Sequence, residues 1–196
     1  MSGRAGGDQG QTVGLYIVAV AALFFLAFAF FAVGQASSVR NSAQTAADAA
    51  ALAAARETRD GIRDDFLDAL NAGDLDKLAD LLAGNGMDGA GACGAAGTFA
   101  AENRAVIDTC DLVSSPSGAK VSLHTEGTVG KSVVHGTENM HARATATGVV
   151  EARCAVDEKD GDTVKFTCDE GTLSVDPSAD DFDLNLAEFY SVHLSE

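Results

Sequence analysis

The chain has 196 residues, of which 29 are acidic and 13 are Lys or Arg, giving a formal net charge of −16. After residue 40 the balance is 28 acidic to 11 basic residues. This balance argues against nucleic acid or anionic lipid as a partner, because phosphate groups are bound by clusters of Lys and Arg.

A long uncharged segment lies near the N-terminus. Residues 13–33 (VGLYIVAVAALFFLAFAFFAV) contain no charged side chain, and at about 1.5 Å per residue they reach about 32 Å, enough to cross a hydrocarbon core. We expect residues 1–12 to be a cytoplasmic leader and 13–34 a single transmembrane helix in contact with the lipid bilayer. A cleaved signal peptide is the alternative, with Gly34-Gln35-Ala36 as a cleavage point, but this apolar run is longer than such peptides usually carry.

The cysteines indicate the orientation of the span. All four, Cys93, Cys110, Cys154 and Cys168, follow it, and an even number of cysteines in a small domain suits an oxidising compartment. The expected localisation is the cell membrane, single-pass, with a cytoplasmic N-terminus and an extracellular C-terminal domain.

Residues 35–60 are expected to form an alanine-rich helical stalk that continues the span. Alanine is the strongest helix former, yet this stretch lacks the leucine or isoleucine stripe by which helices usually dock. Small residues recur every four positions and so form two neighbouring lines along the helix. Such lines let the backbone of another helix approach closely. We expect this helix to pack against the C-terminal domain of its own chain (the head) or against other chains, as a homo- or hetero-oligomer. The alternative is a solvated helix that acts only as a spacer. The two lines are Gly34, Ser38, Ser42, Ala46, Ala50 and Ala54, and Ala43, Ala47, Ala51 and Ala55.

Residues 61–196 are expected to form an extracytoplasmic α+β domain with short helices followed by an antiparallel sheet. Periodic apolar residues predict helices over 62–70, 75–82 after the N-cap Asp74, and 92–103. Strand propensity and turn signals predict strands over 105–113, 119–129, 140–154, 163–168 and 172–175. Ser178 is expected to cap a helix or turn, and 191–194 to form a short strand.

Cysteine spacing favours two structural disulfides. Of the three connectivities, the local one, Cys93–Cys110 with Cys154–Cys168, is the simplest, and each bridge would stabilise the fold by about 3 kcal/mol. A zinc site is the rival interpretation, but the chain has no CxxC pair.

No catalytic, cofactor or metal site is expected. The histidines, His124, His135, His141 and His193, are widely spaced. The acidic turn 157–162 and the acidic cluster 176–183 lack the DxDxDG spacing of a calcium loop, so we expect both to be solvated acidic loops. The chain has no GxSxG, HExxH or phosphate-loop motif. The sequence therefore predicts a protein that is not an enzyme.

Several segments carry a family resemblance. GDQGQTVGLYIVAVAALFFLAFAFFAVGQASSVRNSAQTAADAAALAAA (residues 7–55) resembles the N-terminal region of actinobacterial TadE/TadG-like pilus-assembly proteins of the tight-adherence (Tad, Flp-type) system. CGAAGTFAAEN, KSVVHGTE, EARC and FYSVHL resemble the TadG-related subgroup. TadE-like pseudopilins typically carry a Glu in the first turn after the cleavage glycine, whereas Gly10 is followed by QTVGLY. The resemblance therefore implies a retained anchor of the TadG-like kind.

What the resemblance implies is a membrane-anchored pilus-assembly component or minor pilin that acts in surface attachment with other pilus proteins. The alternative function is a membrane-tethered domain that binds a ligand or an ion and is unrelated to pili.

Overall fold

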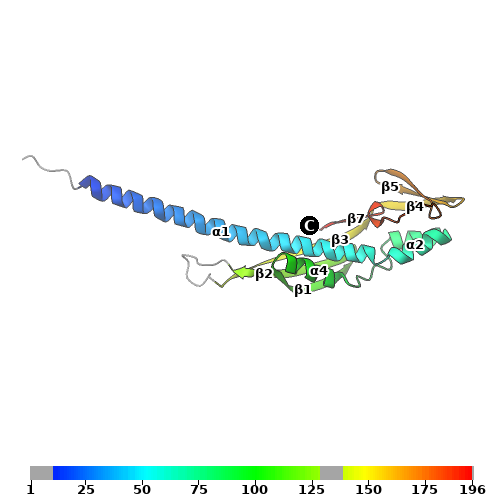
Figure 1. Ribbon diagram of the computed structural model, residues 1–196, viewed down its shortest axis with the longest axis horizontal. Helices are drawn as coiled ribbons and strands as arrows, with labels where there is room; N and C mark the ends of the chain where they lie inside the picture. The colour runs from blue at the N-terminus through cyan, green and yellow to red at the C-terminus, as the bar shows by residue number, and fades with distance from the viewer. Residues whose placement is uncertain (1–10, 129–138, 196) are drawn as a thin grey trace, which may run out of the picture.

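The computed structural model describes residues 11–128 and 139–195 (Figure 1). Most of the expected leader, the KSVVHGTE segment and His135 lie outside these residues. The described chain is α+β, which confirms the expected fold class. A long helix runs from one end, and the sheets and short helices gather along and beyond its second half.

Helix α1 (Gln11–Asp60) is unbroken for 50 residues. It passes from the apolar segment into the alanine-rich segment with no proline in either. Three short helices complete the helical part: α2 (Arg63–Ala72), α3 (Leu75–Leu82) and α4 (Ala92–Glu102). Gly73 ends α2 with a left-handed φ of 64°, and the Asp74 carboxylate accepts the backbone N–H of Lys77 at 3.0 Å to start α3.

The strands form two antiparallel sheets rather than one. The four-stranded sheet has the order β1-β2-β3-β7 and the three-stranded sheet the order β4-β5-β6. The strand bounds are β1 (Ala105–Ser114), β2 (Ser117–Thr128), β3 (His141–Ala152), β4 (Cys154–Asp160), β5 (Thr163–Cys168), β6 (Gly171–Val175) and β7 (Tyr190–Leu194).

Arg153 is the junction between the sheets, so the prediction of one strand over 140–154 is wrong. The β3–β7 pairing ends at Ala152, and the β4–β5 pairing begins at Cys154. The Arg153 backbone N–H donates to the Phe189 carbonyl, and its own carbonyl accepts from the Asp169 N–H. The chain changes sheets at this one residue.

One further expectation is corrected and another is met. The acidic residues from 157 to 160 belong to strand β4 rather than to a turn. Of the helix or turn expected at Ser178, the turn forms, over residues 177–181. The Ser178 N–H and hydroxyl both donate to the Asp176 carboxylate. The 3-10 helix η1 (Leu186–Glu188) follows, capped by Asn185.

The buried side chains fall into two clusters of different character. Large residues fill the end furthest from the N-terminus, where the Phe66, Phe166 and Phe189 rings pack with centroids 4.9–5.0 Å apart. Alanines dominate the cluster between α1, α4 and the four-stranded sheet. The alanine cluster is where α1 meets the rest of the protein.

Candidate functional site on helix α1

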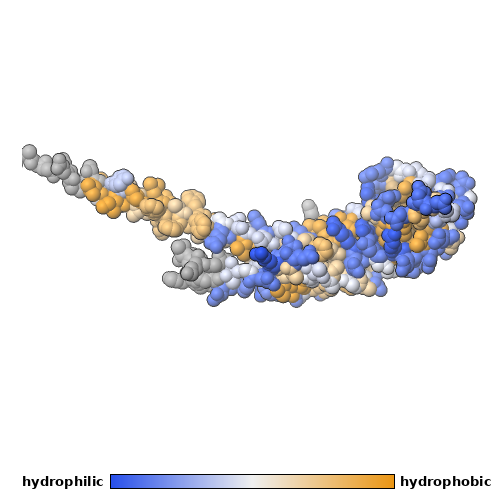
Figure 2. Space-filling view, in the orientation of Figure 1, coloured by the Kyte–Doolittle hydropathy of each residue, from blue (hydrophilic) through white to orange (hydrophobic). Residues whose placement is uncertain are grey.

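The N-terminal half of α1 is apolar and unburied. All of its large hydrophobic side chains between Val13 and Val33 except the partly buried Val20 are 51–75% exposed, and Figure 2 shows this segment standing clear of the head. It is the one helix in the described part of the chain that is long and apolar enough to cross a membrane, with a mean hydropathy of 2.7 over 18 residues. Exposure on this scale in an apolar helix identifies a candidate membrane span.

The C-terminal half of α1 is buried in the head. It packs against β2, β3 and β7 and against α4, and α4 presents its own buried alanines, Ala92, Ala96 and Ala100. Small side chains on both helices allow their backbones to approach closely. Seven alanines of α1 have no exposed surface: Ala43, Ala46, Ala47, Ala50, Ala51, Ala54 and Ala55.

The backbones of α1 and strand β3 approach closely at Gly148. A β-carbon placed on Gly148 would collide with the backbone carbonyl of Ala51 and would lie 3.1 Å from the backbone nitrogen of Leu52. Gly148 also lies beside Ala119 of β2 and Leu194 of β7 in the sheet. Glycine in a strand interior often marks such a backbone contact. The side chains on this face of α1 are therefore small because the helix backbone lies directly on the sheet.

The predicted helix-packing residues divide into two groups. Ala46, Ala47, Ala50, Ala51 and Ala54 are buried inside the head, and the structure brings them together with α4 and the sheet. Gly34, Ser38 and Ser42 are exposed between the span and the head. The hydroxyl of Ser42 donates to the Ser38 carbonyl at 3.0 Å, so the hydrogen bond of this hydroxyl is made within the helix itself.

The exposed group lines an open groove of about 540 Å³. The groove runs along α1 and reaches Asn103 just beyond the end of α4. A second, apolar groove of about 290 Å³ lies further down α1 and is lined by Phe24, Ala27, Phe28 and Phe31. Helical spacing places both grooves on one side of α1, since Phe31, Ser38 and Thr45 are each seven residues apart. We name this surface the open face of α1; its lining residues above the span are Gly34, Ser37, Ser38, Asn41, Ser42, Thr45 and Asn103.

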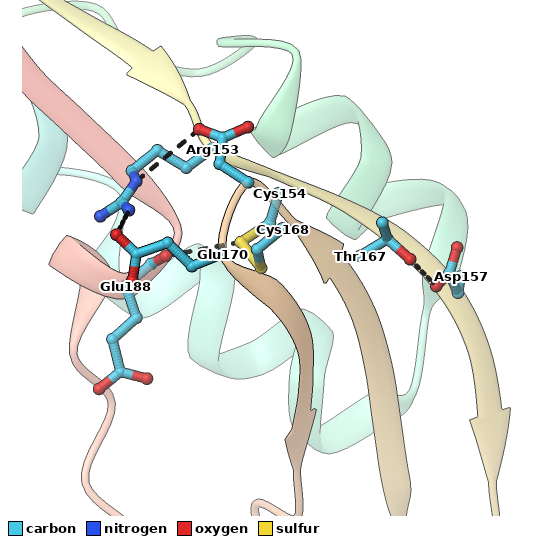
Figure 3. The surroundings of a disulfide bond; sticks show 8 residues. Arg153, Cys154, Asp157, Thr167, Cys168, Glu170 and Glu188 are labelled. Atoms are coloured by element: carbon cyan, nitrogen blue, oxygen red, sulfur yellow. Dashed lines mark hydrogen bonds and ion pairs between the residues drawn. A yellow bond between two sulfur atoms is a disulfide. The ribbon is translucent and has the colours of Figure 1, made fainter.

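Two disulfides hold the head in the local arrangement. Cys93–Cys110 ties the start of α4 to β1, and Cys154–Cys168 joins directly paired residues of β4 and β5. Figure 3 shows Arg153 beside the second bridge and paired with Glu170. Its guanidinium lies 2.7 Å from a Glu170 oxygen. No cysteine is left free. The thiols are therefore unavailable for metal binding or nucleophilic chemistry.

Charge is concentrated at the end of the head furthest from α1's N-terminus. Residues 60–91 and 151–188 contain 20 acidic and 5 basic residues, whereas the rest of the chain after residue 40 contains 8 acidic and 6 basic ones. Within residues 11–128 and 139–195, no three His, Cys, Asp or Glu side chains gather in a way that could hold a metal ion. The expected acidic loops are thus spread over a surface rather than folded into a cage.

The histidines are placed differently from what their spacing suggested. His193 lies on β7 with Nε2 3.6 Å from Glu151. His124 and His141 lie side by side, with ring centroids 5.6 Å apart. Sequence reasoning missed this pair; the available signal was that both residues flank the same β2–β3 connection.

One buried polar group is unusual. The Tyr190 hydroxyl is the only buried side-chain nitrogen or oxygen in the described part of the chain without a hydrogen-bond partner. Tyr190 is 2% exposed, and its ring packs near Phe66. Burial raises the pKa of Tyr190 far above its usual value of 10.0, because the phenolate would lose its solvation.

Comparison with known proteins gives one match. Residues 10–57 match the family model described as Putative Flp pilus-assembly TadE/G-like. Comparisons with curated proteins and with solved structures give no match. The resemblance read from residues 7–55 is confirmed at the family level over this segment, which supports a pilus-related role; the actinobacterial TadG-related subgroup stays a prediction.

Proposed function

We propose, from the TadE/G-like character of residues 10–57, that this chain is a membrane-anchored pilus-assembly or minor-pilin component of a Tad/Flp-type pilus. Residues 13–34 would cross the cell membrane once, with the short N-terminus in the cytoplasm. The head would lie outside, where an oxidising compartment maintains both disulfides.

The open face of α1 supports a mode of contact with partners within this role. It runs without a helix break from the apolar span to the small polar residues above it. A partner that packs along the whole face would cross the membrane boundary beside α1, as a second membrane-spanning helix would. Other pilus proteins with an anchor of the same kind fit this description, and dispersion and backbone contact would hold the helices together.

The acidic end of the head has a separate part in this mechanism. The surface of residues 60–91 and 151–188 carries most of the negative charge, so it stays solvated and repels like surfaces. The body built from α1, α4 and the four-stranded sheet is nearly neutral. We assign partner contacts to the body and the open face, and solubility to the acidic end.

Three variants separate the open face from the buried face. Ser38→Leu with Ser42→Leu fills the open groove; leucine is a better helix former than serine, so the fold should be retained. Ala47→Leu with Ala51→Leu overpacks the head and should cost about 1–3 kcal/mol at each site. Ala36→Leu is the control, because Ala36 is exposed at the same level but does not line the groove.

The readouts are the melting temperature of each purified variant, recovery of pilus proteins by cross-linking, and pili counted by electron microscopy. We expect the serine double variant to melt normally but to lose pili, the alanine double variant to melt lower, and Ala36→Leu to behave like wild type. Normal pili after deletion of the gene would contradict the pilus role. Normal pili in the serine double variant alone would contradict only the use of the open face.

A further inference from the structure

His124 of β2 and His141 of β3 form an exposed pair on adjacent strands. Their ring centroids are 5.6 Å apart and their planes cross at 74°. The His124 side chain is 29% exposed and His141 is exposed. Both rings are therefore open to an ion from solvent.

Hydrogen bonds fix the tautomer of both rings. His124 Nδ1 lies 2.7 Å from the Asp108 carboxylate, and His141 Nδ1 lies 2.7 Å from the Thr125 carbonyl oxygen. Carbonyl and ionised carboxylate oxygens only accept hydrogen bonds, so each neutral ring carries its proton on Nδ1. The lone pair of each ring then lies on Nε2, and the hydrogen bonds and ion pairs of these rings within the described residues all involve Nδ1.

We propose that His124 and His141 bind one divalent transition-metal ion through their Nε2 atoms, a site independent of the proposed pilus role. Donation of Nδ1–H to a carboxylate or carbonyl is the arrangement that orients metal-ligating histidines. Imidazole ligands suit zinc, copper and nickel, and the Irving–Williams order places Cu²⁺ as the tightest of these. Calcium and magnesium are excluded, because they require a cage of oxygen ligands.

The spacing of the rings fits two ligands of one ion. With metal–nitrogen distances of about 2.0–2.1 Å, two imidazole centroids on a tetrahedral ion lie about 5 Å apart. The observed 5.6 Å is close to this separation. In the described chain no third side chain joins the pair, so water completes the coordination and the binding is of the weak, exchangeable kind.

Two neighbouring charges modulate the site in opposite directions. Arg143 is the cross-strand neighbour of His124, and its positive charge disfavours a cation. Asp108 opposes this effect and makes the His124 ring a better ligand. Asp108 is thus a positioning residue rather than a ligand.

The test uses the full chain in detergent, without a histidine tag and with His135→Ala and His193→Ala, so that only the pair remains. Zinc chloride is titrated by calorimetry, and Cu²⁺ is followed by electron paramagnetic resonance, which counts equatorial nitrogen ligands. We expect one ion per chain with two imidazole nitrogens. His124→Ala or His141→Ala in this background should weaken binding at least about tenfold, and Asp108→Asn by about 10- to 100-fold.

Arg143→Gln provides a change in the opposite direction, because removing the positive charge should tighten binding while leaving both ligands in place. Binding of neither ion by the reference variant would overturn the proposal. Equal binding by the reference and by either single alanine variant would also overturn it. A copper spectrum with a single imidazole nitrogen would show that the rings act separately, which contradicts the shared site.

Discussion

The Ala51 carbonyl of α1 occupies the space that a β-carbon on Gly148 of β3 would require. The helix backbone and the strand backbone touch here with no side chain between them. This contact explains why the head-facing side of α1 is alanine, since larger residues would hold the helix away from the sheet.

Gly148→Ala should lower the free energy of unfolding by about 1–3 kcal/mol, because the added methyl group forces α1 and β3 apart. Urea denaturation followed by circular dichroism measures the change. Gly94→Ala is the matched control: an added β-carbon there meets no atom within 4 Å, and removing a helical glycine should stabilise α4 by about 0.5–1 kcal/mol. Equal stability of Gly148→Ala and wild type would contradict the backbone contact.

Tyr190→Phe should raise the free energy of unfolding by about 1 kcal/mol. The Tyr190 hydroxyl is buried without a partner, and leaving such a group unpaired costs about 1–3 kcal/mol. Thermal melts of the two proteins test this expectation. Tyr16→Phe, at a side chain 71% exposed on the span, should leave the melting temperature unchanged. A marked loss of stability in Tyr190→Phe would mean that the hydroxyl is paired in solution.

The raised pKa of Tyr190 predicts that the free energy of unfolding falls at alkaline pH. Its folded pKa is raised above the ordinary value of 10.0 by burial, so above pH 10 the unfolded chain loses its proton first. This titration leaves the free energy of unfolding unchanged below pH 10 and lowers it by about 1.4 kcal/mol per pH unit above pH 10. Unfolding measured from pH 8 to 11.5 should show this extra loss in wild type relative to Tyr190→Phe. Parallel profiles for the two proteins would rule it out.

The disulfides should account for much of the stability of the head. Each closes a short loop, with sequence separations of 17 and 14 residues, and each should contribute about 3 kcal/mol. A digest without reductant, analysed by mass spectrometry, should contain Cys93–Cys110 and Cys154–Cys168 peptides. Dithiothreitol should lower the melting temperature in the absence of denaturant. Recovery of four free thiols from native membranes would contradict the oxidising location.

The helices were predictable because their signals are local. An uncharged run, an alanine run, and the Asp74 cap followed by leucines each specify a helix without reference to distant residues. The division of the sheet at Arg153 could not be predicted in this way. It depends on hydrogen bonds to Phe189 and Asp169, which lie far away in the chain.

The same distinction applies to the candidate site. Spacing alone identified a line of small residues from Gly34 to Ala54, but it could not say which of them are covered. The answer depends on where Gly148 and α4 lie in the fold, and only the three-dimensional arrangement reveals this. The pairing of His124 with His141 likewise depends on the register of β2 and β3, which the sequence does not specify.

The uninterrupted length of α1 makes the molecule a lever. Fifty residues at about 1.5 Å each give a rod of about 75 Å, joined to the head along its second half and free of proline. A change of about 10° in the tilt of the span moves the far end of such a rod by about 13 Å. If residues 13–34 cross a membrane as proposed, the head and the apolar half of α1 turn together, and a force applied to the head would reach the bilayer as a torque.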